Sequence, residues 1–128
     1  MKKMEEISKL KEGRYIVIDG AACVIMKMSR SAPGKHGHAK YRVDAVDVIT
    51  GSKKVMLYTG HDKVEVPIIE KKPAQVLGIS GNTAQVMDME TYENFDLEIP
   101  DELKDKIVVG AQVMYWSILG KKVLKSLK

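Results

Sequence analysis

The residues best suited to chemistry lie in one polar stretch, residues 29–40, which reads Ser-Arg-Ser-Ala-Pro-Gly-Lys-His-Gly-His-Ala-Lys. Lys35 stands between Gly34 and Gly37, and no side chain in the stretch is more apolar than alanine or proline. A hairpin turn needs only about two to five residues, so a connection of this length and polarity is typical of a functional loop. Glycines also permit positive φ and the close approach of another surface. We interpret the stretch as a loop that presents one amine.

Two other chemistries fit the same residues less well. A phosphate-binding P-loop needs a glycine five positions before Gly34 and a Ser or Thr after the lysine, and the sequence has serine and histidine there. His36 and His38 would share one face of an extended segment and could hold a metal. Zinc takes at least three protein ligands, and only His61 and Cys23 remain as His or Cys partners. We therefore expect no metal, and the acidic residues form no evident hydrolytic constellation.

Charge is distributed unevenly along the chain, whose formal net charge is +4. Residues 1–72 hold 15 Lys and Arg against 9 Asp and Glu, whereas residues 73–128 hold 6 against 8. No acid occurs between Asp19 and Asp44, a segment that contains five cations including Lys35. A positive surface around the loop favours phosphate backbones or acidic protein surfaces as partners.

The elements that position this loop are predicted to be mainly β-strands. Asp19-Gly20 between two apolar runs is a strong hairpin signal, and five or six short strands in about 70 residues predict a small barrel. The polar residues 70–73, which end in Pro73, mark the boundary between a domain at 1–72 and a domain at 73–128. The predicted strands of the first domain are residues 15–18, 21–28, 41–48, 54–58, 63–66 and 68–71.

The second domain begins with another hairpin signal, Gly81-Asn82. Three strands, one short helix and two strands follow one another, which is the order of an OB barrel. The strands are predicted at residues 75–79, 83–87, 92–99, 112–118 and 122–127, and the helix at residues 100–106.

The sequence also predicts the cellular location of the protein. Residues 1–6 are charged and no apolar region follows them, so we expect no secretory signal, and no apolar run is long enough to span a membrane. Cys23 lies in an apolar run and is expected to be buried. A reducing cytoplasm is the expected location.

The loop sequence Gly34-Lys-His-Gly-His-Ala-Lys40, between the second and third predicted strands, resembles the hypusine loop of the translation initiation factor 5A family, which is related to bacterial elongation factor P. The similarity covers essentially the whole chain, and Ala32-Pro33 before the loop resembles archaeal members. The resemblance implies an all-β fold of two small barrels. The first, at 1–72, is SH3-like and carries the modified lysine. The second, at 73–128, is an OB-fold with one short helix.

The resemblance also implies a function. Lys35 would receive an aminobutyl group from spermidine through deoxyhypusine synthase and end as deoxyhypusine or hypusine, with no separate cofactor. The chain would be a cytoplasmic, monomeric factor without membrane contact, not an enzyme. It would bind the ribosome through ribosomal RNA and reach toward peptidyl-tRNA, promoting peptide-bond formation at stalling sequences such as consecutive prolines. Contacts with RNA and with the modifying enzyme are expected from Arg30, Ser31, Gly34, His36, Gly37, His38 and Lys40.

Two alternatives remain open from the residues alone. One is a generic single-stranded RNA-binding OB protein, although the acids of residues 88–105 would repel RNA and the aromatics of the second half are few. The other is a small metal-dependent hydrolase that uses His36 and His38.

Overall fold

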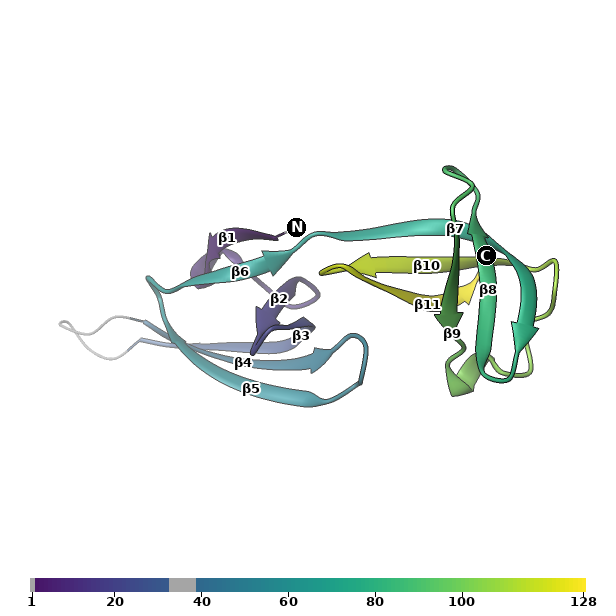
Figure 1. Ribbon diagram of the computed structural model, residues 1–128. Helices are drawn as coiled ribbons and strands as arrows, with labels where there is room; N and C mark the ends of the chain where they lie inside the picture. Colours follow the sequence, from purple (N-terminus) through teal and green to yellow (C-terminus); the bar gives the residue numbers. More distant parts are fainter. Residues whose placement is uncertain (1, 33–38) are drawn as a thin grey trace. The chain divides into compact units, whose positions relative to one another are not determined.

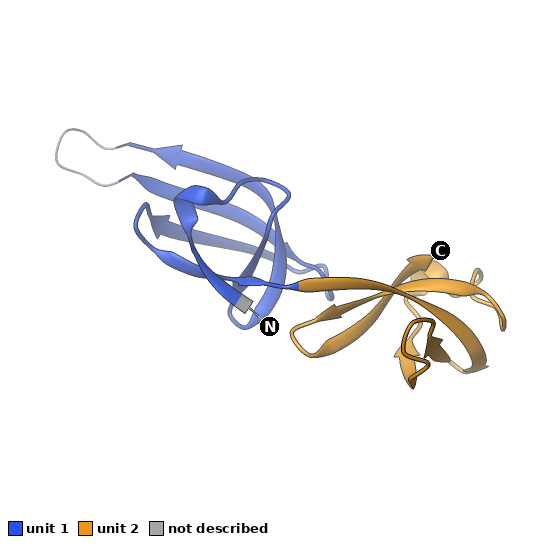
Figure 2. Ribbon diagram, turned by 90° about the horizontal axis from the view of Figure 1, so that it is seen from above, with its two compact units in different colours: residues 1–68 blue, residues 69–128 orange. Residues whose placement is uncertain are grey.

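The computed structural model describes residues 2–32 and 39–128, and the chain divides into two compact units, residues 1–68 and residues 69–128 (Figure 2). Within the described ranges the chain consists of eleven β-strands and two 3-10 helices of three residues each (Figure 1). The all-β fold class with two small barrels is therefore confirmed. Each unit has its own hydrophobic core.

The first unit is an antiparallel barrel. Strands β2, β3, β4 and β5 form one sheet in that order, β1 pairs with β6, and β6 also lies beside β2. The predicted turn between β2 and β3 is present, with Asp19 at φ 52° and Gly20 at φ 78°, the left-handed values that a tight two-residue hairpin requires. The elements are β1 (Lys2–Glu6), η1 (Ile7–Lys9), β2 (Tyr15–Ile18), β3 (Ala21–Ser31), β4 (Lys40–Asp47), β5 (Lys53–Thr59) and β6 (Lys63–Pro67).

Strand β1 was not expected from the sequence, because four of its five residues are charged and they give no apolar alternation. It forms by pairing with β6, whose Val64 and Val66 supply the buried side chains of this corner. Ile7 and Leu10, which follow β1, are both buried in the same core. The N-terminal segment therefore closes the barrel rather than preceding it.

The second unit has the strand order of an OB barrel. Its single sheet runs β11-β10-β7-β8-β9, and β11 lies beside β9, which closes the sheet on itself. The predicted helix at residues 100–106 is present only as the 3-10 helix Asp101–Leu103, followed by buried Ile107. The elements are β7 (Ile69–Ser80), β8 (Thr83–Asp88), β9 (Asn94–Glu98), η2 (Asp101–Leu103), β10 (Gln112–Ile118) and β11 (Lys121–Leu127).

The two units divide after Ile68, whereas the sequence suggested a boundary after residue 72. Residues 70–73 lie inside β7, opposite β10. Pro73 is accommodated because its carbonyl accepts a hydrogen bond from the Met89 amide at 3.1 Å, on the side away from β10. The N and the C=O of one strand residue point to the same side of the strand, so the nitrogen of Pro73 also points away from β10. The N–H that proline lacks is therefore not one that the β7–β10 ladder needs.

Candidate functional site

The segment singled out by the sequence connects β3 to β4. The last register pair of this hairpin is Ser31 with Lys40, so eight residues, 32–39, join the two strands. On the other side of β4, Lys40 pairs with Thr59, and the Gly60 amide donates to the Ala39 carbonyl at 2.8 Å. Three strands therefore fix the base of the connection.

The base of the connection lies beyond the barrel core. The last fully buried residue of β3 is Ile25, and the first of β4 is Val43. Immediately after Ile25 a β-bulge interrupts the register, and Met26 at this bulge is 59% exposed. A bulge bends and twists a strand, so the hairpin changes direction where it leaves the core.

The cations at the base lie on two different faces of the sheet. Arg30 is opposite Tyr41, on the face that continues the core. Ser31 is opposite Lys40, and since neighbouring strand residues point to opposite faces, Lys40 faces away from Arg30. Positive charge therefore lies on both faces of the sheet at the base of the connection.

A cavity of about 430 Å³ lies beside Arg30 on the core side. The Glu12 carboxylate at its rim accepts a hydrogen bond from the Met28 amide at 3.4 Å. Tyr58, on the β5 side of the same face, has a pKa above its ordinary value because burial disfavours the phenolate, and nearby Asp19 adds to this. The cavity is lined by Leu10, Lys11, Glu12, Met28, Arg30 and Tyr41.

The opposite face of the sheet combines cations with exposed apolar side chains. Arg42 is opposite Leu57, which is 73% exposed, and Asp44 is opposite Val55. The Arg42 Nε lies 3.3 Å from Asp44 Oδ1, an exposed pair of small energetic weight. This face offers contact area and charge to a partner, whereas the core-side face offers a pocket.

The structure places three of the predicted site residues, Arg30, Ser31 and Lys40, at the base of the connection. It brings Ser31 and Lys40 together and separates Arg30 from Lys40. The other five, Gly34, Lys35, His36, Gly37 and His38, lie outside the described residues, so their roles stay predictions.

Sequence reasoning missed the contribution of residues 10–12 and of Tyr41 to this site. Leu10 is buried, and its spacing of three residues from Ile7 was the signal that this charged segment packs against the barrel. Nothing in the sequence indicates that Glu12 reaches the β3 backbone.

Over residues 2–32 and 39–128 no three His, Cys, Asp or Glu side chains are grouped as metal ligands. In the same ranges no helix is long and apolar enough to cross a membrane. Cys23 is buried as expected, and burial, with the charge of Asp47, raises the pKa of its thiol.

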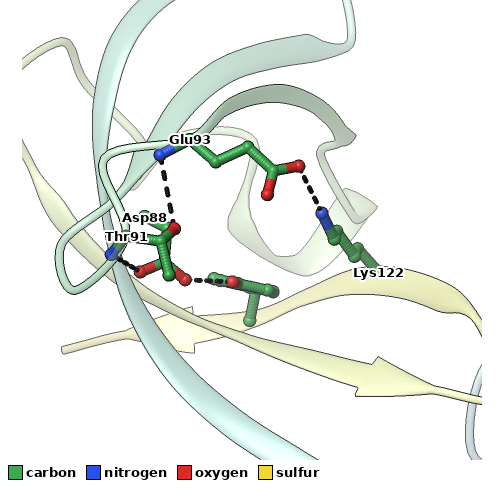
Figure 3. Close-up of polar contacts among 5 residues, drawn as sticks. Asp88, Thr91, Glu93 and Lys122 are labelled. Carbon is green, nitrogen blue, oxygen red and sulfur yellow. Dashed lines mark hydrogen bonds and ion pairs between the residues drawn. The ribbon is translucent and has the colours of Figure 1, made fainter.

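One acidic residue of the second unit, Asp88, is buried. Asp88 is 2% exposed, and its carboxylate accepts hydrogen bonds from the Tyr115 hydroxyl and from the Glu90 amide at 2.7 Å. The Thr91 amide donates to the same carboxylate at 2.9 Å (Figure 3). Burial alone would raise its pKa, but these hydrogen bonds together hold it below the ordinary value. Because both carboxylate oxygens have donors, Asp88 is a structural residue of the barrel.

Comparison with known proteins identifies relatives of the whole chain. The family model described as "Translation initiation factor 5A-like, N-terminal" matches residues 2–61. A protein of Archaeoglobus fulgidus named translation initiation factor 5A is 46% identical over 125 residues, which cover 98% of each chain. Its namesake in Methanosarcina mazei is 48% identical over 121 residues, 94% of each chain.

Two solved structures are similar to this chain in fold. The structure titled eukaryotic translation initiation factor 5A from Methanococcus jannaschii superposes with a TM-score of 0.90 at 38% identity, covering 99% of this chain and 95% of that one. A family protein from Naegleria fowleri gives a TM-score of 0.81 at 28% identity, with 99% and 98% coverage.

Proposed function

Since the chain belongs to the translation initiation factor 5A family and is a translation factor, we propose that it acts on the ribosome through a modified Lys35. The modification joins the lysine Nζ to the four-carbon aminobutyl group of spermidine, and the three-carbon diamine part of spermidine leaves. Deoxyhypusine synthase is the proposed modifying enzyme. The product is deoxyhypusine, or hypusine where a hydroxyl group is added.

The observation that carries this proposal is the hairpin β3–β4. Eight residues join Ser31 to Lys40 at a point where the strands have already left the core. Two residues would suffice to close an antiparallel pair. In the sequence, no side chain of residues 32–39 is more apolar than alanine or proline, so a task outside the barrel best explains the length of the connection.

The charges at the base fit insertion into a cleft lined with phosphate. Arg30 and Lys40 face opposite sides of the sheet, so both walls of such a cleft meet a cation. Contacts of this kind fix the register and orientation of a protein on RNA without reading its bases. They favour ribosomal RNA and the acceptor end of peptidyl-tRNA as partners.

The modified side chain would supply what an ordinary lysine cannot. It carries a second amine on a longer stem, which reaches further into a narrow channel and can pair with phosphates there. Holding a poorly placed peptidyl-tRNA in a reactive geometry lowers the entropic part of the barrier to peptide-bond formation. The ribosome performs the reaction, and the chain acts as a cytoplasmic, monomeric factor that positions its substrate.

In vitro translation tests this function directly. A reporter with consecutive prolines and a matched reporter with alanines are translated with ribosomes of the same lineage. The modified protein is expected to raise the yield of the proline reporter only, and Lys35→Arg is expected to lose this effect. Lys53→Arg, on the exposed face of β5, serves as the matched control. Full rescue by Lys35→Arg would contradict the proposal.

A further inference from the structure

Strand β5 lies at the edge of the four-stranded sheet in the first unit. The sheet order is β2-β3-β4-β5, and among the described residues β5 pairs in register with β4 alone (Figure 1). The pairing is regular over the seven residues of the strand, without the bulge that protects many natural edges. An edge of this kind presents a row of backbone N–H and C=O groups to an incoming strand.

The direction of these backbone groups follows from a hydrogen bond at the end of β5. The Gly60 amide donates to the Ala39 carbonyl at 2.8 Å, so the backbone of residue 60 points toward β4. The N–H and C=O groups of successive residues in an antiparallel strand point to alternate sides. The even-numbered residues of β5 therefore point their backbone toward β4, and Val55 and Leu57 point theirs outward.

The side chains of the same two residues lie on the outer face of the sheet. Val55 is 54% exposed and Leu57 is 73% exposed, whereas Met56 and Tyr58 pack against the core. A hollow of about 440 Å³ on this outer face is lined by Val55 and by the exposed Met26, among others. Apolar side chains of a docked strand would be buried there.

Cations surround these apolar side chains. The residues that line the hollow include three lysines and Arg42 against one acid, Asp44. The Arg42 Nε lies 3.3 Å from the Asp44 carboxylate, which offsets that one negative charge. The hollow therefore carries an excess of positive charge. We call five residues of this face the β5 surface: Met26, Lys27, Arg42, Val55 and Leu57.

We propose that the β5 surface binds an extended acidic segment of a partner protein, which adds a strand to the sheet beside β5. In this mode of recognition, backbone hydrogen bonds to an exposed edge supply affinity and alternate side chains supply specificity. Acidic side chains of the segment meet the cations, and its apolar side chains cover Val55 and Leu57. The surface does not include the connection 32–39, so this proposal goes beyond the function proposed for Lys35.

Two other occupants fit the β5 surface less well. A second copy of this chain would bring two positively charged surfaces together, and like charges repel. RNA phosphates accept hydrogen bonds but donate none, so the outward carbonyls of β5 would stay without partners. Single-stranded RNA also stacks on aromatic rings, whereas Tyr41 and Tyr58 of β4 and β5 lie on the core side of the sheet. A polypeptide supplies both donors and acceptors to the edge.

The test measures peptide binding to the full chain by fluorescence anisotropy. The probe is a labelled seven-residue peptide in which glutamate alternates with valine, equal in length to β5. A peptide with lysine in place of glutamate is expected to bind at least about tenfold more weakly, because its charge matches that of the surface. A fully N-methylated glutamate peptide keeps the side chains but has no N–H donors, and it is also expected to lose at least about tenfold.

Hydrogen exchange of single amides, followed by NMR, distinguishes strand addition from contact with side chains alone. In the free chain the outward amides of Val55 and Leu57 are expected to exchange rapidly, and those of Met56 and Tyr58, which point toward β4, slowly. With the glutamate peptide at about 100 times its Kd, exchange at Val55 and Leu57 is expected to slow about 100-fold, which is the limit set by the unbound fraction.

Protein variants separate the backbone of the edge from its charges. Val55→Pro removes an outward N–H without interrupting the ladder with β4, and it is expected to weaken binding at least about tenfold. Val55→Thr keeps that N–H and is expected to lose less than about fivefold. Lys27→Gln and Arg42→Gln are each expected to weaken binding about two- to fivefold. Lys3→Gln, on β1 in the other sheet of this unit, is the matched control and should bind as the wild type does.

Four results would overturn this inference. Rapid exchange at Val55 and Leu57 that persists in the peptide complex would exclude strand addition. Equal binding of the lysine peptide would exclude selection by charge. Displacement of the peptide by 12-nucleotide oligo(U) at equal charge concentration would assign the surface to RNA. A dimer in sedimentation that the peptide dissociates would assign it to a second copy. The modification of Lys35 enters none of these measurements, so the two proposals fail separately.

Discussion

Replacing Tyr115 with phenylalanine removes one hydroxyl from the core of the C-terminal barrel and leaves a buried carboxylate with one donor fewer. The Tyr115 hydroxyl donates to Asp88 Oδ2, while the Asp88 Oδ1 has two backbone donors. A hydrogen bond to a charged group contributes about 1.5–3 kcal/mol, and an uncompensated buried charge adds to the loss. We expect a decrease of about 2–3 kcal/mol in the free energy of unfolding.

Urea denaturation followed by Trp116 fluorescence measures this loss, because the only tryptophan lies in the same barrel. For a unit of this size the loss corresponds to a decrease in Tm of roughly 10–20 °C. The matched control is Tyr92→Phe, because Tyr92 is 71% exposed and its substitution should change stability by less than about 0.5 kcal/mol.

The loss of unfolding free energy in Tyr115→Phe should also depend on pH, in a direction set by the pKa of Asp88. The pKa of Asp88 is lower in the folded chain than in the unfolded one, so its contribution is complete above about pH 4 and is lost as the pH falls through the folded value. Without the Tyr115 donor this pKa is less depressed. The difference between wild type and Tyr115→Phe should therefore be largest at neutral pH and shrink below about pH 4. A loss under about 0.5 kcal/mol, or one that is constant from pH 7 to 3, would refute the reasoning.

Three further predictions concern the N-terminal barrel. Because burial raises the pKa of the Cys23 thiol, we expect no reaction with a disulfide reagent at pH 8 until urea unfolds the chain; rapid native reaction would disprove this. The Asp47 carboxylate accepts two backbone amides of the following turn at 2.8 and 3.1 Å, so Asp47→Ala should lower the free energy of unfolding by about 1–3 kcal/mol in urea titrations, and an unchanged midpoint would contradict this. Gly20→Ala should cost about 1–2 kcal/mol because φ is +78°, whereas Gly60→Ala should be nearly neutral, since the nearest atom to an added Cβ is 3.5 Å away; equal losses would be inconsistent with these backbone conformations.

The parts of the fold that could be predicted are those with a local cause. Asp19-Gly20 and Gly81-Asn82 mark hairpins because their residue types tolerate tight turns, and both hairpins are present. Strand β10 was predicted with its observed bounds, because β-branched and aromatic residues fill it between turn residues. The order of strands in the second unit followed from these signals.

The parts that could not be predicted depend on pairing between distant strands. Nothing near Asp88 in the sequence distinguishes it from the exposed acids that follow, and its partner Tyr115 lies 27 residues away. The separation of Arg30 from Lys40 depends on the register of β3 with β4, which a bulge at Met26 shifts.

The central claim, that Lys35 is the working residue and carries an aminobutyl group, is tested most directly by mass spectrometry. Protein is purified from its native organism, and the peptide that spans Ser31 to Lys40 is fragmented to locate any added mass. The account predicts that Lys35 alone carries an aminobutyl group, with or without one further oxygen. A peptide whose Lys35 is wholly unmodified in protein from growing cells would contradict it.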